Sequence, residues 1–139
     1  MVIEDNPTNQ LYEQLRTPVL AVRPADAPTV DRYWKKFAVM EKDANGVLQG
    51  GVYIVLHPGW ANIDLIWVDE SRRGQGLGRK LMEKAEQESV QRGCHSAFLW
   101  TQDFEVPAFY EKLGYRRFVV LDNFIPGHQR IGFMKQLAA

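Results

Sequence analysis

The chain has 139 residues, of which 45% are apolar and 24% charged, a profile that fits one globular domain over residues 1–139. Its 17 basic side chains balance its 17 acidic ones, so no net field attracts nucleic acid or an anionic membrane, and neither is expected as a partner. Cys94 is the single cysteine, so it forms no disulfide within the chain and excludes a cysteine-based zinc site; no metal is expected.

The N-terminal residues lack the pattern of a secretory signal. Glu4 and Asp5 stand in a segment that has no basic region followed by an apolar one. The longest apolar runs are too short to span a bilayer. Together with the lone thiol, these features predict a cytoplasmic protein.

The first third of the chain has the weakest periodicity. Residues 2–4 fit a short edge strand, and residues 9–16 place Leu11 and Leu15 on one helical face. Pro18 is the first of three prolines that break any long helix, so residues 17–31 are left without a predicted element.

The signal improves from residue 34 onward. Residues 34–43 and 47–56 are strand-like runs joined through Asn45-Gly46, a strong cue for a hairpin. After a turn at His57-Pro58-Gly59, residues 61–69 are nearly continuous and bulky, which predicts a strand with both faces covered. The three runs predict an antiparallel meander.

An amphipathic helix over residues 77–92, ended by Gly93, follows a glycine cluster. Residues 96–101 form a short buried strand, and the order strand, helix, strand predicts a parallel crossover. Three elements close the chain, namely a helix over residues 106–113 and strands over residues 115–121 and about 130–136. The fold class is therefore α+β with a mixed sheet.

The most informative stretch lies between the bulky strand and the amphipathic helix and reads Arg72-Arg73-Gly74-Gln75-Gly76-Leu77-Gly78-Arg79. Three glycines in five residues cost backbone entropy, so something must require their missing side chains. A helix N-terminus presents unpaired N–H groups and a positive dipole end, and glycines let a phosphate come close. Arg73, with Arg72 and Arg79 beside it, would add charge-assisted hydrogen bonds, so the stretch predicts an anion site.

Three anion-binding patterns compete for this stretch. The mononucleotide P-loop fails because Gly78-Arg79-Lys80 offers no hydroxyl for magnesium, and the dinucleotide fingerprint fails because its third glycine arrives one residue early. The pattern Arg/Gln-x-x-Gly-x-Gly/Ala is met in full by Arg73, Gly76 and Gly78.

Two blocks of this sequence resemble the GNAT superfamily of N-acetyltransferases. Residues 68–82 look like its acyl-CoA pyrophosphate loop, and residues 107–115 are similar to its fourth-helix motif, in which a Tyr precedes Glu-Lys-Leu-Gly-aromatic. The resemblance extends from about residue 36 to the C-terminus. It implies a GNAT-like acyl-CoA N-acyltransferase fold, with a mostly antiparallel sheet of about six to seven strands flanked by helices. For the glycine-rich stretch itself, the alternative is a tight strand-to-helix connection that binds no ligand.

The resemblance implies acetyl-CoA as the cofactor. Its pyrophosphate would be bound by Arg73 and by the loop amides of Gly74, Gln75, Gly76, Leu77, Gly78 and Arg79. Its pantetheine arm would pair like an added strand with the backbone of Ile66, Trp67 and Val68. This pairing requires the strands over residues 61–69 and 96–101 to splay apart, as they do in the family.

The resemblance also implies that Tyr110 protonates the departing thiolate as a general acid. A thiol titrates near ~8.5 and a phenol near ~10, so this proton transfer is only modestly uphill. A core tyrosine with a satisfied hydroxyl is the alternative. Phe109 and Leu113, one helical turn apart, are expected in the core.

An acceptor amine with a pKa near ~10.4 must lose a proton before it attacks. Asp64 is the candidate base, because a carboxylate inside an apolar strand is costly unless it is paired or usefully hydrated. A solvent-facing or Arg-paired carboxylate is the alternative, and Glu41 is a less favoured base. His128 lies either near the acceptor cleft or in solvent, whereas His57 and His95 are given no role.

One position departs from the family pattern. Many relatives carry an Asn seven residues before the tyrosine, where this chain has Asp103, which accepts but cannot donate a hydrogen bond as a carboxylate. A narrower set of relatives shares a Phe-x-x-Pro-x-Phe-Tyr stretch and a later Pro-Gly-His, matched here by Phe104, Pro107, Phe109, Tyr110 and residues 126–128. The likeness to this narrower set does not indicate a substrate.

The sequence therefore predicts an enzyme that moves acetyl from acetyl-CoA to a primary amine, with a small-molecule acceptor favoured because the balanced charge gives no sign of an acidic groove. A non-catalytic acyl-CoA sensor or scaffold is the second hypothesis, and a structural partner protein that binds no CoA is the third. By fold analogy, strand pairing at the sheet edge would allow a homodimer.

Overall fold

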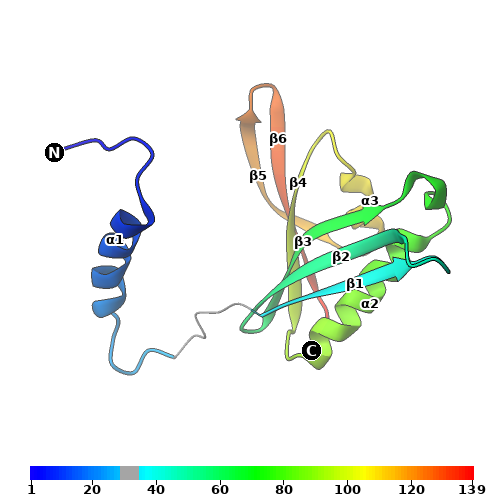
Figure 1. Ribbon diagram of the computed structural model, residues 1–139, viewed down its shortest axis with the longest axis horizontal. Coiled ribbons are helices and arrows are strands. Elements are labelled where there is room, and N and C mark those ends of the chain that lie inside the picture. The colour runs from blue at the N-terminus through cyan, green and yellow to red at the C-terminus, as the bar shows by residue number, and fades with distance from the viewer. Residues whose placement is uncertain (29–34) are drawn as a thin grey trace. The chain divides into compact units, whose positions relative to one another are not determined.

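The computed structural model describes residues 1–28 and 35–139 (Figure 1). The chain divides into two compact units, Met1–Asp31 and Arg32–Ala139. The first unit holds α1 (Asn9–Ala21). The second holds β1 (Lys36–Lys42), β2 (Leu48–His57), β3 (Trp60–Val68), the 3-10 helix η1 (Glu70–Arg72), α2 (Leu77–Gln91), β4 (Ser96–Gln102), α3 (Pro107–Lys112), β5 (Arg116–Ile125) and β6 (His128–Gln136). The single domain expected over residues 1–139 stays a prediction.

The N-terminal unit confirms the predicted helix but not its end. Thr8 caps α1 through its side chain, which accepts a hydrogen bond from a backbone N–H of the first turn. The helix continues through Pro18 to Ala21, so the expected break at Pro18 is wrong. A proline removes one backbone hydrogen bond, and the turn that follows still forms here.

The expected edge strand at residues 2–4 is wrong, because these residues form no regular element. A strand needs a neighbour to pair with, and the described residues of this unit contain no strand. Trp34, at the start of the strand predicted over residues 34–43, lies outside the described residues, and that strand begins at Lys36.

The described strands form one six-stranded sheet with the order β1-β2-β3-β4-β6-β5. The first three strands make the predicted antiparallel meander, with Asn45-Gly46 in the turn between β1 and β2. β3 and β4 are parallel and connected through α2, and β6 pairs antiparallel with both β4 and β5. These pairings confirm the α+β class with a mixed, mostly antiparallel sheet.

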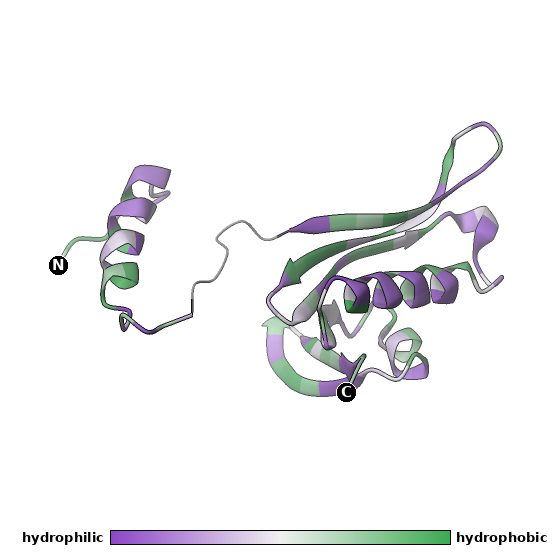
Figure 2. Ribbon diagram, turned by 90° about the horizontal axis from the view of Figure 1, so that it is seen from below, coloured by the Kyte–Doolittle hydropathy of each residue, from purple (hydrophilic) through white to green (hydrophobic). Residues whose placement is uncertain are grey.

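α2 covers one face of the meander and builds the core with it. Its buried side chains are those of Leu77, Leu81, Met82, Ala85 and Ser89. The four apolar ones pack in one cluster with buried residues of β2 such as Val52 and Ile54. Each large apolar side chain buried there contributes roughly 1.5–3 kcal/mol. The outer side of α2 is hydrophilic, as its purple surface in Figure 2 shows.

β3 is covered on one face only, so the prediction of two covered faces is wrong. Ile63 is buried, whereas Leu65 and Trp67 are 66% and 45% exposed. The pairing with β2 shifts inside this strand, because Tyr53 pairs with Leu65 while the next residue of β2 pairs with Ile63. Asp64 is thus the extra residue of a β-bulge, and the bulge puts Leu65 on the exposed face together with Asp64.

β3 and β4 separate after a short paired stretch. They pair only where residues 60–62 face residues 96–98. β3 then continues to Val68 and β4 to Gln102 without pairing with each other. Figure 1 shows β5 and β6 leaning away from β1–β3. The splay that the family resemblance requires is therefore present.

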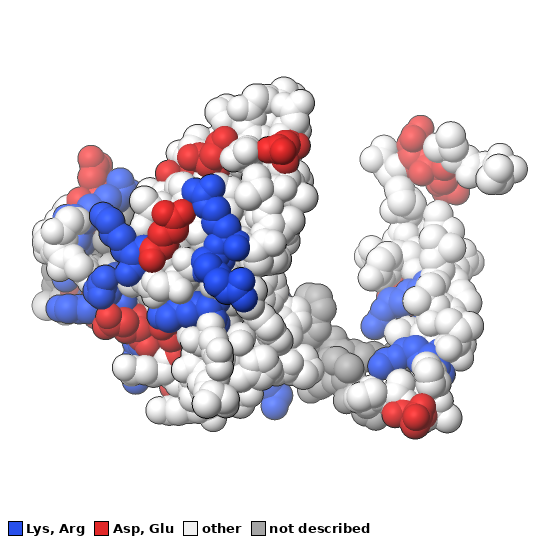
Figure 3. Space-filling view, turned by 180° about the vertical axis from the view of Figure 1, so that it is seen from behind, with Lys and Arg blue, Asp and Glu red and all other residues white. Residues whose placement is uncertain are grey.

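The closing hairpin is longer than predicted. β5 runs to Ile125 instead of ending at residue 121, and β6 begins at His128, so Pro126-Gly127 is a two-residue turn. Acidic and basic side chains are interspersed on the face of the larger unit that Figure 3 shows. No helix among residues 1–28 and 35–139 has both the length and the apolar character to cross a membrane.

Candidate functional site

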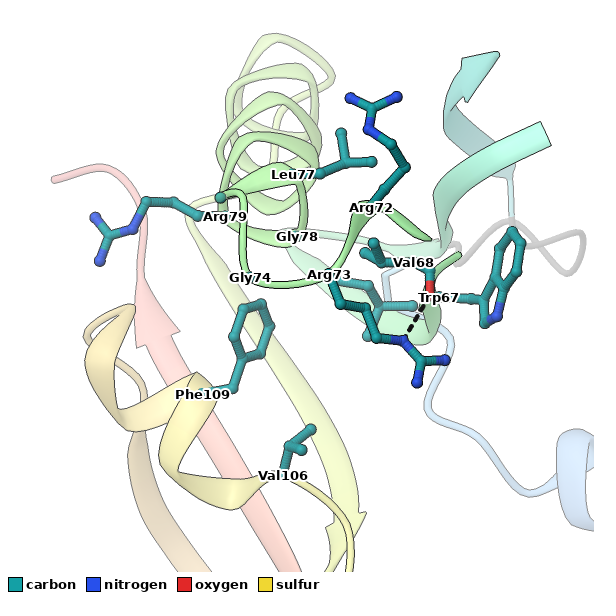
Figure 4. A pocket seen from close by; sticks show the side chains of 12 residues that line it. Trp67, Val68, Arg72, Arg73, Gly74, Leu77, Gly78, Arg79, Val106 and Phe109 are labelled. Atoms are coloured by element: carbon teal, nitrogen blue, oxygen red, sulfur yellow. Dashed lines mark hydrogen bonds between the residues drawn. The ribbon is translucent and has the colours of Figure 1, made fainter. Parts of the chain in front are cut away.

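The chain turns sharply where β3 ends. The carboxylate of Asp69 accepts hydrogen bonds from the hydroxyl and the backbone N–H of Ser71, which lower the pKa of Asp69. Arg73 folds back onto the strand, and its Nε donates to the backbone oxygen of Val68 at 3.0 Å (Figure 4). These bonds fix the turn that leads into α2.

Two glycines in this turn are required by the backbone. Gly74 has a φ of 72°, and Gly76, the N-cap of α2, has a φ of 80°. Any other residue would pay roughly 1–2 kcal/mol in this left-handed region. No atom lies within 4 Å of the position that a Cβ would take at either glycine, so open space adjoins both.

The N-terminus of α2 presents free backbone donors to this space. The first helical hydrogen bond runs from Lys80 N to Gly76 O at 3.1 Å, so the N–H groups of residues 77–79 precede the helical ladder. Gly76 supplies no side-chain cap for them. With the positive end of the helix dipole, these donors suit an anion.

A pocket of about 630 Å³ adjoins the turn (Figure 4). Its lining residues are Ile66, Trp67, Val68, Arg72, Arg73, Gly74, Gly76, Leu77, Gly78, Arg79, Val106 and Phe109. The walls from β3 and from the segment around α3 are apolar, and the basic side chains come from the turn (Arg72 and Arg73) and from the first turn of α2 (Arg79). The pocket therefore suits a ligand with an anionic group at one end and a long, less charged arm.

The β3 wall of the pocket also offers backbone hydrogen-bonding groups. Beyond residue 62, β3 has no partner on its β4 side. An extended ligand could pair with this free edge through main-chain bonds, as an added strand does. An internal edge of this kind exists only because the sheet splays.

The structure brings together all but one of the cofactor residues expected from the sequence. Gln75 is the exception, because its Nε2 donates to Ser71 O at 3.1 Å and its side chain lines a neighbouring hollow instead. Two lining residues, Val106 and Phe109, were not expected. Adjacent helical residues point about 100° apart, so Phe109 can face the pocket while Tyr110 faces the core.

Phe109 connects the two blocks of the sequence motif. A Cβ at Gly78 would lie 3.3 Å from Cζ of the Phe109 ring. The third glycine therefore lets α3 pack against the N-terminus of α2. The expectation of Phe109 in the core is half right, because the ring packs against the core cluster and lines the pocket as well.

Tyr110 lies in the core beside the pocket and is 6% exposed. Its ring centroid is 5.3 Å from that of Phe109 and 5.9 Å from that of Phe133. Burial, together with the negative charge of Glu105, raises the pKa of Tyr110 to about 12. The phenol is therefore fully protonated at neutral pH.

Asp64 and the histidines stand apart from this pocket. Asp64 is exposed on the bulge of β3 and is not among the lining residues. His128 has its Nδ1 3.0 Å from Oδ1 of Asp103, and the backbone N–H of Gln129 donates to the other oxygen of Asp103 at 2.9 Å. That backbone bond is the main cause that lowers the pKa of Asp103. Asp103 thus ties the end of β4 to the β5–β6 hairpin.

A split mixed sheet, with an open strand edge that leads to a glycine-rich helix N-terminus, is the arrangement that the family resemblance predicts for an acyltransferase that binds acyl-CoA. The family model for the acetyltransferase (GNAT) family matches residues 8–115, and the chain belongs to this family. It is therefore an acetyltransferase that uses an acyl-CoA donor.

Proteins of known structure or activity resemble most of the chain. Blasticidin-S acetyltransferase of Streptomyces morookaense is 32% identical over 126 residues, which cover 90% of this chain and 86% of the relative. The crystal structure of an acetyltransferase from Bacillus cereus ATCC 14579 has a TM-score of 0.80 and 26% identity, and the match covers 98% of this chain and 97% of that one. An aminoglycoside 6'-N-acetyltransferase solved with coenzyme A shares the fold, with a TM-score of 0.70, 20% identity, and 100% and 98% of the two chains covered.

Proposed function

We propose that this protein transfers the acetyl group of acetyl-CoA to a primary amine of a small molecule. The observation that carries the proposal is the pocket, in which the open edge of β3 leads to the free N–H groups of α2. The cofactor's pyrophosphate would bind the amides of residues 74–79 and Arg73. Its pantetheine arm would pair with the backbone of Ile66, Trp67 and Val68.

Tyr110 is proposed as the general acid. The amine nitrogen attacks the thioester carbonyl, the new C–N bond forms, and the C–S bond breaks as Tyr110 protonates the sulfur. With a pKa of about 12, Tyr110 holds its proton until a strong base forms nearby. A thiolate leaving within an apolar pocket is a stronger base than in water, because burial disfavours the charged form. The higher basicity of the thiolate offsets the weaker acidity of Tyr110.

Asp64 is proposed as the base that receives the proton of the acceptor ammonium. Its carboxylate is exposed on the β-bulge, outside the lining of the pocket, so it would act through water. Asp64→Asn should lower the rate most at a pH where the acceptor is protonated, and should matter less as the pH approaches the pKa of the amine.

The named activities of the relatives indicate acceptors for a first screen. One relative is named for blasticidin S and another for aminoglycosides. Release of the CoA thiol should depend on an added amine in a panel that includes blasticidin S and kanamycin. Tyr110→Phe should lower kcat by roughly 10²- to 10⁴-fold while the affinity for CoA stays the same. Tyr12→Phe, on the exposed face of α1, is the matched control.

A non-catalytic acyl-CoA sensor is the alternative that the sequence left open, and membership of the acetyltransferase family favours the enzyme. The same assay separates the two functions. Tight binding of acetyl-CoA without thiol release for any amine would favour the sensor, and absence of CoA binding would contradict both. Homodimer formation, proposed from fold analogy, is tested by sedimentation equilibrium of the full chain.

A further inference from the structure

A polar turn follows the part of β4 that has left β3. Thr101 is 3% exposed, and its hydroxyl donates to Oε2 of Glu105 at 3.2 Å. The backbone N–H of Glu105 donates to the oxygen of Gln102 at 3.1 Å and closes the turn. A buried hydroxyl and a main-chain bond therefore both position the exposed carboxylate of Glu105 between β4 and α3.

This carboxylate is close to the pocket and to the proposed acid. Val106, the next residue, lines the pocket, and so does Phe109 four residues on. The charge of Glu105 also acts on Tyr110, because it contributes to the raised pKa of the phenol. Glu105 thus adjoins the place where the proposed reaction would occur.

Glu105 has no cationic partner among residues 1–28 and 35–139. Glu111, on the following helix α3, is by contrast paired, because its Oε1 is 3.0 Å from Nε of Arg117. The same turn contains Oε1 of Gln102, a buried acceptor to which no described residue donates. The turn therefore holds two side-chain acceptors, the carboxylate of Glu105 and Oε1 of Gln102, that lack a cationic or N–H partner among the described residues.

We propose that Glu105 binds the protonated amine of the acceptor and places it beside Tyr110. This inference rests on the proposed acetyl transfer at the same site. It assigns the acceptor to the aliphatic ammonium compounds, because a charged N–H donor matches the unpaired carboxylate and a neutral aromatic amine does not. The overall step takes one ammonium and one acetyl-CoA to one acetamide, one CoA thiol and one proton.

Binding of the cation would also act on the general acid. The negative charge of Glu105 holds the pKa of Tyr110 up, and an ammonium beside Glu105 would offset that charge. Burial remains the first cause of the raised pKa, so the pKa of Tyr110 falls by only part of its shift. The lowering lasts while the nitrogen of the acceptor carries its charge.

The test compares Glu105→Gln with Glu105→Asp and Glu111→Gln in the full-length protein. The amide of Gln can still accept the hydroxyl of Thr101, so Glu105→Gln removes the charge and keeps the turn. With blasticidin S and kanamycin as acceptors, Glu105→Gln should raise the acceptor KM by about 10-fold to 100-fold. The dissociation constant of CoA should stay the same, Glu105→Asp should recover part of the loss, and Glu111→Gln should match the wild type.

Each other outcome has a distinct meaning. An unchanged acceptor KM in Glu105→Gln, while the wild type transfers acetyl, overturns the role of Glu105 and leaves the transferase intact. Loss of CoA affinity in the same variant, or no recovery in Glu105→Asp, shows a structural role and also overturns it. A wild-type protein that acetylates no amine overturns the proposed function and this inference together.

Discussion

Gly76 and Gly46 share one backbone conformation but differ in their surroundings. Their φ angles are 80° and 79°, and neither has an atom within 4 Å of the position that a Cβ would take. Gly46 lies in the turn between β1 and β2, whereas Gly76 caps the helix at the pocket. Substitutions at the two positions therefore distinguish the effect of backbone strain on stability from an effect on ligand binding.

Replacement of either glycine by alanine should lower the free energy of unfolding by a similar amount, roughly 1–2 kcal/mol. Only Gly76→Ala should also weaken CoA binding, because its methyl group enters the space next to the helix amides. Urea unfolding measures the first effect and isothermal titration with CoA the second. Equal CoA affinity in the two variants would contradict the assignment of the loop.

Single residues of the site were predictable to different degrees. Gly76 is marked in the sequence because its left-handed backbone favours glycine, and Gly78 because the ring of Phe109 leaves little room for a Cβ. The roles of Arg73, Gly76 and Gly78 in binding stay a prediction. Asp64 stood out as a carboxylate in an apolar strand, but that strand is covered on one face only, and the exposure of Leu65 beside it depends on a bulge in the pairing with β2. Pairing register is a property of two strands, so one strand's sequence does not show it.

At the scale of elements, the contact between α2 and α3 joins the two motif blocks. Gly78 is helical and adjoins the ring of Phe109. Alanine there would gain about 1 kcal/mol in helix propensity, yet its Cβ would press on the ring at 3.3 Å. The ring would have to move, and it forms part of the pocket wall.

Gly78→Ala should therefore weaken CoA binding in the wild-type background. In a Phe109→Ala background the methyl group has room, so the added effect of Gly78→Ala should be small. Isothermal titration of the four proteins forms a double-mutant cycle. Additive losses in the cycle would show that the two side chains act independently.

The elements were mostly predicted, since hydrophobic periodicity marks helices and strands along one stretch of chain. The wrong predictions are those in which the structure of a segment depends on a neighbouring strand or helix. Residues 2–4 have no described strand to pair with, and no described element packs over Leu65 and Trp67 of β3, which are exposed. α1 passed its expected end because a proline late in a helix removes one hydrogen bond without stopping the chain from turning.

At the scale of the whole molecule, the buried tyrosines couple stability to pH. The pKa of Tyr110 rises to about 12 on folding, chiefly through burial, and burial also raises the pKa of Tyr115. An unfolded tyrosine titrates near ~10. The folded state keeps the proton longer, so this stabilisation is full below about pH 10 and is lost as the pH rises toward 12.

The free energy of unfolding should accordingly fall between about pH 10 and 12, by about 1.4 kcal/mol for each unit of pKa shift. Tyr110→Phe keeps the ring and should make this fall smaller, whereas Tyr12→Phe should not change it. Urea unfolding at several alkaline pH values measures the slope. An identical slope in Tyr110→Phe and wild type would contradict the raised pKa of Tyr110.

Because β3 and β4 pair over only a short stretch, side chains of β3 beyond it can change without altering the main-chain groups at its free edge. Where the two strands part, peptide groups rather than side chains face the opening. Every amino acid except proline carries the same peptide N–H and C=O, so a change of Ile66 or Trp67 alters the shape of the wall but not its donors and acceptors. If acyl-CoA pairs with this edge as proposed, recognition of the donor depends on the main chain, and the side chains around it can vary toward different acceptors without loss of those hydrogen bonds.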